Sequence, residues 1–148
     1  MAVMKIGEDG IVLIKKFEGL RIRSYRDTVG IWTVGFGHTG PDVHPNMEIT
    51  EEEADALLKD DLSHAERCVN SKVSVALTQG EFDALCSFVF NLGCGKFAGS
   101  TLCRLINSGD PDGLAPQEFG KWIKAGGIEL AGLVARREAE LELFESTA

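Results

Sequence analysis

The sequence is poor in positive charge and has no long apolar run. Its 148 residues include 15 Lys and Arg against 23 Asp and Glu, which gives a net charge of −8 at pH 7. Binding to nucleic acid without sequence preference depends on basic side chains that neutralise phosphates, so we expect no nucleic-acid partner. No stretch approaches the roughly 18 apolar residues of a membrane span, and Met1 to Glu8 lack the apolar segment of a signal peptide. We therefore expect a cytoplasmic chain without stable membrane insertion.

Signals for metal sites and disulfides are also missing. The three His show neither HExxH nor paired spacing, and the four Cys show no CxxC spacing. We expect no metal and no cofactor. The Cys are interpreted as reduced core residues, although their even number permits two disulfides; they are Cys68, Cys86, Cys94 and Cys103.

The negative charge is concentrated in one segment. Residues 1–40 carry six basic and four acidic side chains, a net charge of +2, and residues 67–148 carry eight and ten, a net charge of −2. Residues 41–66 carry one basic and nine acidic side chains, a net charge of −8. We interpret this acidic segment as mostly the solvated face of a helix.

Periodicity, caps and glycines divide the first half of the chain into elements. A helix is predicted over about 7–18, with Gly19 at its end. The stretch 23–38 combines β-branched and aromatic residues with glycines, which predicts short antiparallel strands, and 38–46 is predicted to be a loop. Thr50 and Glu53 form a capping-box pattern that begins a helix over about 50–70.

The second half is predicted to be helical. Thr78 and Glu81 repeat the capping pattern and begin an almost wholly apolar helix that ends at Gly93 and belongs in the core. Further helices are predicted over 100–107, 117–124 and 133–144. The expected fold class is α+β, in a single domain over 1–148. It would have a β-containing lobe over about 19–48, a larger all-helical lobe over 1–18 and 67–148, and the helix over 50–70 linking the two.

Two carboxyl groups flank the start of the β-rich stretch. Glu18 ends the first helix among apolar neighbours, which favours a protonated acid, and Asp27 lies in a polar turn, which favours a carboxylate. Glycoside hydrolysis uses such a pair, and the Thr33 hydroxyl six residues later could hold a water. From spacing alone, a residue at a helix end and a turn-forming residue explain the two acids better than a catalytic pair does.

Longer motifs resemble one family. Glu18, Asp27 and Thr33 have the spacing of the Glu-Asp-Thr triad of the phage-type lysozymes, glycoside hydrolase family 24. The stretch from Phe17 to Thr39 resembles that family's active-site region, and similarity extends over about 7–145 through the segments ITEEEA, FDAL, FNLG, STL and RRE. The resemblance implies a lysozyme-like fold with a small antiparallel β lobe.

The resemblance also implies a function. The chain would be an endolysin, a muramidase that hydrolyses the β-1,4 bond between N-acetylmuramic acid and N-acetylglucosamine in peptidoglycan and so lyses the host cell. Glu18 would be the general acid, Asp27 would activate the attacking water, and Thr33 would assist. Family members are regarded as inverting, so we predict that the two carboxyl groups lie about 6.5–9.5 Å apart. We expect a monomer that leaves the host cytoplasm for the periplasm and wall after a holin opens the inner membrane.

Four further residues are predicted to contact the substrate: Gly35, Asn91, Arg136 and Arg137. Asn91 is equally well a buried amide with satisfied hydrogen bonds, and both arginines are equally well exposed helix residues. The resemblance places His38 and Tyr25 near the site, with His38 anchoring the lobe by hydrogen bonds rather than acting as a base. The sequence departs from the family pattern in its net acidity and at Ala135, where relatives often carry a polar or basic residue.

Three other functions fit parts of the sequence. A zinc amidase acting on peptidoglycan would need the ligand spacing that the His and Cys lack. A lytic transglycosylase uses a single acidic residue, whereas Asp27 and Thr33 are both present here. A wall-binding module without activity is disfavoured because all three triad residues are retained.

Overall fold

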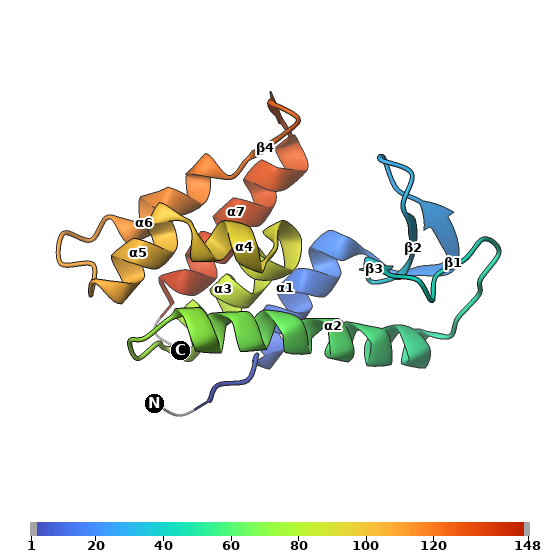
Figure 1. Cartoon of the computed structure of the whole chain (residues 1–148), viewed down its shortest axis with the longest axis horizontal. Coiled ribbons are helices and arrows are strands. Elements are labelled where there is room, and N and C mark those ends of the chain that lie inside the picture. Colours follow the sequence, from blue (N-terminus) through green and yellow to red (C-terminus); the bar gives the residue numbers. More distant parts are fainter. Residues whose placement is uncertain (1–2, 147–148) are drawn as a thin grey trace. The chain divides into compact units, whose positions relative to one another are not determined.

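The computed structural model describes residues 3–146, and the chain forms two compact units. Among the described residues, the β unit comprises residues 14–64, and the helical unit comprises residues 3–13 and 65–146. The boundaries between them fall inside two helices, α1 (Glu8–Glu18) and α2 (Glu51–Lys72), so each helix contributes to both units (Figure 1). Within residues 3–146, no helix is long and apolar enough to cross a membrane.

A three-stranded antiparallel sheet forms much of the β unit. Strands β1 (Arg21–Arg26), β2 (Trp32–Gly35) and β3 (His38–Thr39) lie in the order β1-β2-β3 (Figure 1). The register shifts between Arg21 and Tyr25, which marks a bulge in β1. The predicted short antiparallel strands are therefore confirmed, and the segment predicted as a loop begins with the two residues of β3.

Predicted caps set the helix ends. α1 stops before Gly19, whose φ of +71° is seldom adopted by a residue with a Cβ. Thr50 and Glu53 make both hydrogen bonds of a capping box at the start of α2, at 3.0 and 3.1 Å. Thr78 and Glu81 do the same at the start of α3 (Gln79–Leu92). These local signals held because each depends on residues only three positions apart.

The helical unit is built around α3, in which every residue from Phe82 to Val89 is buried. α3 packs against α7 (Ala131–Phe144) and α4 (Cys94–Ala98), and α5 (Thr101–Asn107) packs against α6 (Ala115–Glu118). The Phe88 ring makes edge contacts with Phe97, Phe119 and Trp122, with ring centres 5.6–6.0 Å apart. This aromatic cluster forms the centre of the core.

Parts of the helical unit differ from the prediction. Strands β4 (Lys124–Ala125) and β5 (Ile128–Glu129) form a hairpin around Gly126 and Gly127, so the unit is not all-helical. The helix predicted over 117–124 is instead α6 followed by a 3₁₀ turn over Phe119–Lys121. Two glycines with positive φ favour a tight hairpin turn, and strands this short leave no periodicity to detect. The short helix α4 was not predicted either.

The prediction that all four Cys are reduced is wrong for one pair. Cys68 near the end of α2 and Cys94 at the start of α4 form a disulfide, with Cα atoms 5.9 Å apart. Cys86 and Cys103 are reduced and buried, as predicted. The fold brings together two segments 26 residues apart in sequence, which spacing patterns alone do not indicate.

Candidate active site

The main chain of Ile31 holds both Asp27 and Thr33 in the β unit. Oδ1 of Asp27 accepts hydrogen bonds from the amides of Val29 (2.9 Å) and Ile31 (2.8 Å). The Asp27 amide donates to the Ile31 carbonyl (2.9 Å), and the Thr33 hydroxyl donates to the same carbonyl (3.0 Å). One peptide segment therefore fixes the carboxylate and the hydroxyl relative to each other.

This arrangement leaves acceptors for a water. Asp27 Oδ2 makes no hydrogen bond with any residue in the range 3–146, because both amides bond to Oδ1. The Thr33 oxygen donates its hydrogen to Ile31 and keeps its lone pairs. Asp27 is half-buried and Thr33 is buried, so both sit within the structure rather than on an open surface. Together they offer one carboxylate oxygen and one hydroxyl oxygen.

Glu18, the last residue of α1, lies against the main chain of Gly37. Gly37 has a φ of +73°, and a Cβ at this position would overlap Oε1 of Glu18 and lie 3.1 Å from its Cδ. Glycine is thus required twice here, for its backbone conformation and for the space that the carboxyl occupies. Glu18 is half-buried.

His38 ties β3 to the segments around it. Its Nδ1 lies 2.8 Å from Oδ2 of Asp61 on α2, and its Nε2 lies 3.0 Å from Oδ2 of Asp42. Burial disfavours the charged imidazole, but the hydrogen bonds to Asp61 and Asp42 outweigh it and raise the pKa of His38 above 6.5. The bond to His38 lowers the pKa of Asp42. Both ring nitrogens are engaged by carboxylates, and these contacts link β3 to α2 and to Asp42.

Two other predicted residues of the β unit have defined places. Gly35 was predicted to contact substrate, but it is buried, and a Cβ there would lie 3.4 Å from the side chains of Ala54 and Ile49. Its place is inside the packing between β2 and α2. Tyr25 is half-buried, pairs with Thr33 across β1 and β2, and carries the guanidinium of Arg21 over its ring.

The remaining predicted residues lie within the helical unit. Arg136 and Arg137 are only 4% and 1% exposed, so neither is the surface residue considered as an alternative, and neither offers an open face to a glycan. Nη2 of Arg137 donates to Oε2 of Glu140 and Oδ1 of Asn91, both at 2.9 Å. Nε of Arg136 donates to the Ser87 hydroxyl at 3.3 Å. We conclude that these residues form an internal polar network.

Glu140 is the acidic centre of that network. It is fully buried and forms an ion pair with Arg137, whose Nε lies 2.7 Å from Oε1 of Glu140. The angle of this contact is too poor for it to count as a hydrogen bond. Burial raises the pKa of Glu140 despite the opposing effects of Arg137 and of the hydrogen bond from Ser87. Asn91 is half-buried, and its Oδ1 is taken up by Arg137.

Sequence reasoning missed the structural parts played by Ile31 and Asp42. A turn signal was present for the first, because an Asp followed by a Gly three positions later favours a turn in which the Asp side chain caps later amides. Asp42 was counted with the acidic segment, and no local pattern links it to His38.

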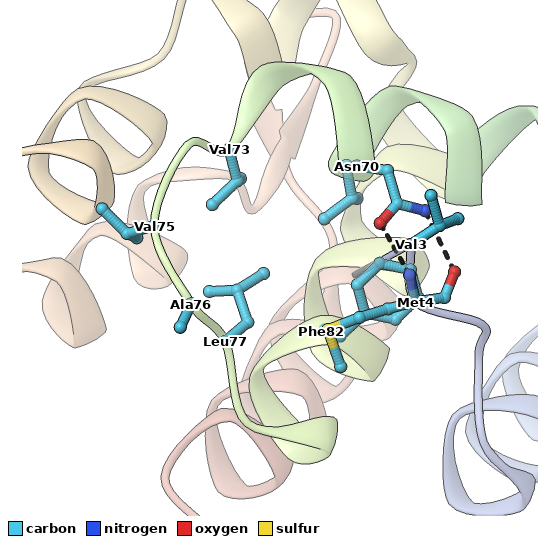
Figure 2. Close-up of a pocket in the computed structure, with 9 residues that line it drawn as sticks. Val3, Met4, Asn70, Val73, Val75, Ala76, Leu77 and Phe82 are labelled. Atoms are coloured by element: carbon cyan, nitrogen blue, oxygen red, sulfur yellow. Dashed lines mark hydrogen bonds between the residues drawn. The ribbon is translucent and has the colours of Figure 1, made fainter. Parts of the chain in front are cut away.

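The helical unit contains an apolar cavity of about 460 Å³, lined by Met4, Asn70, Val73, Leu77 and Phe82 among others (Figure 2). Asn70 is its polar side chain, and it accepts a hydrogen bond from the Met4 amide (2.9 Å) and donates one to the Met4 carbonyl (3.0 Å). The lining supplies no acid, base or nucleophile. Over residues 3–146, no cluster of three or more His, Cys, Asp or Glu is arranged to hold a metal. The β-unit residues are therefore the candidates for chemistry.

Known proteins similar in sequence are phage lytic enzymes. The phage lysozyme family model matches residues 15–140. The endolysin of Acyrthosiphon pisum secondary endosymbiont phage 1 is 45% identical over 147 residues, which cover 97% of this chain and 99% of that protein. The endolysin of Bacillus phage B103 is 46% identical over 95% of this chain, which spans only 54% of that longer protein.

Solved structures agree with these matches. The muramidase domain of SpmX from Asticaccaulis excentricus superposes with a TM-score of 0.88 at 40% identity, covering 96% of this chain and 98% of that one. A variant of phage P22 lysozyme superposes with a TM-score of 0.85 at 42% identity, covering 97% and 99%. The predicted α+β, lysozyme-like fold is confirmed.

Proposed function

Since the chain belongs to the phage lysozyme family, we propose that it is an endolysin that hydrolyses the β-1,4 bond between N-acetylmuramic acid and N-acetylglucosamine in peptidoglycan. The relatives named as endolysins and the muramidase domain of SpmX support a peptidoglycan-hydrolysing enzyme. The bond specificity and the catalytic roles proposed below are supported mainly by one observation: the main chain of Ile31 forms hydrogen bonds with the side chains of both Asp27 and Thr33.

Glu18 is the proposed general acid. It donates its proton to the glycosidic oxygen as the bond to the sugar C1 breaks, so the leaving sugar departs as a neutral alcohol. The contact with Gly37 supports this role, because it restricts where the carboxyl group can lie. A half-buried position suits an acid that must meet both protein and substrate.

Asp27 and Thr33 are proposed to act on the water. Oδ2 of Asp27 accepts one hydrogen bond from the water and takes up its proton, while the Thr33 oxygen accepts the other. The water oxygen forms the new bond to C1 on the face opposite the leaving group, so the configuration at C1 inverts. This route needs space for a water between Asp27 and the sugar, which is why we predict a carboxyl separation of about 6.5–9.5 Å from Glu18.

Digestion of purified peptidoglycan tests the proposal. Glu18→Gln keeps the shape of the side chain but removes its proton donor, so we expect the rate of reducing-end formation to fall about 10²–10⁴-fold. Glu52→Gln is the matched control, because it changes an exposed carboxylate of α2 in the same way. Full activity of Glu18→Gln would overturn the assignment.

Product analysis separates the other candidate reactions. Hydrolysis adds one water for each bond cleaved and leaves a reducing end, whereas a transglycosylase leaves a 1,6-anhydro end that is lighter by one water. An amidase would release the peptide stems and leave the glycan intact. Inversion of the β bond gives the α anomer first, which NMR of fresh product detects; the β anomer would indicate retention.

Release from the host cell is a separate part of the proposal. We expect the enzyme to accumulate as a monomer in the cytoplasm and to reach the wall when a holin opens the inner membrane. Cells that express only this chain should lyse promptly after chloroform is added and remain intact before it. Lysis without chloroform would contradict the dependence on a holin.

A further inference from the structure

A cation stacked on an aromatic ring adjoins the proposed catalytic group. Cζ of Arg21 lies 4.2 Å from the centre of the Tyr25 ring. This is closer than Arg26 over Trp32, at 5.2 Å. Stacking at this distance fixes the plane of the guanidinium, although Arg21 is exposed.

The pairing of β1 with β2 sets where this guanidinium lies. Tyr25 is the cross-strand partner of Thr33, and side chains of such partners stand next to each other on one face of a sheet. The guanidinium of Arg21 is therefore one side chain away from Thr33, and Thr33 shares the Ile31 carbonyl with Asp27. The bulge between Arg21 and Tyr25 brings the two side chains together although they are four residues apart on one strand.

Arg21 and Arg26 both lack an acidic partner among residues 3–146, whereas two other nearby cations are paired. Lys15 pairs with Asp55 at 2.8 Å, and Arg23 approaches Glu48 at 3.8 Å. In the part of the chain that the structure describes, no carboxylate forms an ion pair with Arg21. Arg21 is exposed and its charge is uncompensated, and the geometry of its N–H donors matches a carboxylate.

We propose that Arg21 binds a carboxylate of the peptide stem that the muramic acid of the substrate carries. This inference rests on the proposed function. The glycan strand itself is neutral apart from its stems, so the stem carboxylates are the anionic groups that come near the site. Asp27 would repel them, and a fixed guanidinium beside Thr33 offsets that repulsion.

Three soluble substrates separate this role from general effects on the enzyme. The first is uncross-linked glycan with intact stems. The second is the same glycan with its stem carboxyls converted to amides. The third is glycan from which an amidase has removed the stems and whose newly exposed lactyl carboxyls have then been converted to amides. The KM and kcat of each variant are measured on all three by the release of reducing ends.

Four variants define the contact. Arg21→Ala removes the charge, Arg21→Lys keeps the charge without the planar fork, and Tyr25→Leu removes the ring beneath it. Arg104→Ala is the control, because it removes an exposed arginine of α5 and changes the net charge equally. Thermal unfolding establishes that each variant is folded.

We expect Arg21→Ala to raise KM about fivefold on the intact stems, with kcat almost unchanged, and to leave both other substrates unaffected. On intact stems, the KM values of Arg21→Lys and Tyr25→Leu should lie between those of Arg21→Ala and the wild type. The KM of Arg104→Ala should equal that of the wild type. An equal loss on all three substrates, or no loss on intact stems, would overturn the inference and leave the proposed function standing. If the wild type cleaves none of the three, the proposed function itself fails.

Discussion

Gly37 and the carboxyl group of Glu18 leave no room for a side chain between them. In Gly37→Ala, the added Cβ would overlap Oε1 of Glu18 and crowd its Cδ, 3.1 Å away. The carboxyl lies at the end of a flexible side chain, whereas the Gly37 backbone is fixed next to β3, so the carboxyl is the group that moves. A displacement of about 1 Å from the productive position lowers a catalytic rate about 100-fold.

The cost in stability should be small by comparison. Alanine at a φ of +73° costs about 1–2 kcal/mol in backbone strain, partly offset by the lower entropy of the unfolded chain. For a protein of this size, a net loss of about 1 kcal/mol lowers the melting temperature by about 2–4 °C. We therefore expect a large loss of activity in a protein that remains folded.

Gly113→Ala is the matched control for backbone strain. Gly113 has a φ of +65° and nothing within 4 Å of a Cβ, so the variant carries the strain without the steric contact. Both variants should melt within a few degrees of each other, and only Gly37→Ala should lose about 100-fold in kcat on peptidoglycan. A wild-type kcat in Gly37→Ala, or an equal loss in Gly113→Ala, would refute the reasoning.

Three further predictions concern stability. Because the pKa of His38 is raised in the folded state, its pairing stabilises the fold fully below pH 6.5, and this stabilisation is lost as the pH rises through the folded-state pKa. In urea unfolding, Asp61→Asn should therefore cost about 1–2 kcal/mol near pH 5.5 and less near pH 9. An equal cost at both pH values would contradict this. Reducing the disulfide, whose Cys are 26 residues apart, should lower the free energy of unfolding by about 3 kcal/mol, and unfolding curves that dithiothreitol does not change would count against it. Arg137→Met removes the closer of the two arginines that pair with the buried Glu140, the other being Arg136 at 3.5 Å. It should cost about 3–5 kcal/mol in thermal unfolding, and a cost below about 1 kcal/mol would contradict this.

Local signals explain which parts of the fold could be predicted. Thr50 with Glu53 and Thr78 with Glu81 each form a cap from residues three positions apart, so their sequence pattern contains the whole interaction. The disulfide, by contrast, depends on where α2 and α4 meet, and its two Cys are 26 residues apart. A hairpin of two-residue strands around Gly126 gives too few residues for periodicity to distinguish from a loop.

In the site, too, local contacts could be predicted and contacts between distant residues could not. Glu18, Asp27 and Thr33 were selected by spacing and family resemblance, and the bonds that link Asp27 to Thr33 span only six residues. The alternative that Arg137 is an exposed helix residue is wrong. It was considered because a charged residue in a helix usually faces solvent, and its partner Asn91 is 46 residues away. Burial of a charge is a property of the packed unit, which a single sequence does not reveal.

The acidic segment, residues 41–66, does more than form the solvated face of a helix. Asp42 and Asp61 are two of its nine acidic residues, and together they hold both nitrogens of His38. His38 follows Gly37 directly, so this clamp also fixes the backbone against which Glu18 lies. The net acidity in which the sequence departs from the family pattern therefore contributes to positioning the proposed acid.

Asp55, another residue of the acidic segment, holds a residue of α1 close in sequence to Glu18. It pairs with Lys15 on the last turns of α1, at 2.8 Å, and the ammonium of Lys15 lies 5.1 Å from the centre of the Phe36 ring. The Lys15–Asp55 pair is over a third exposed at both ends, so salt should weaken it. The contact of the buried His38 with Asp61, which is 22% exposed, should be less sensitive. Of the two contacts, the His38 clamp is therefore the one that can hold the site at the ionic strength of a lysing cell.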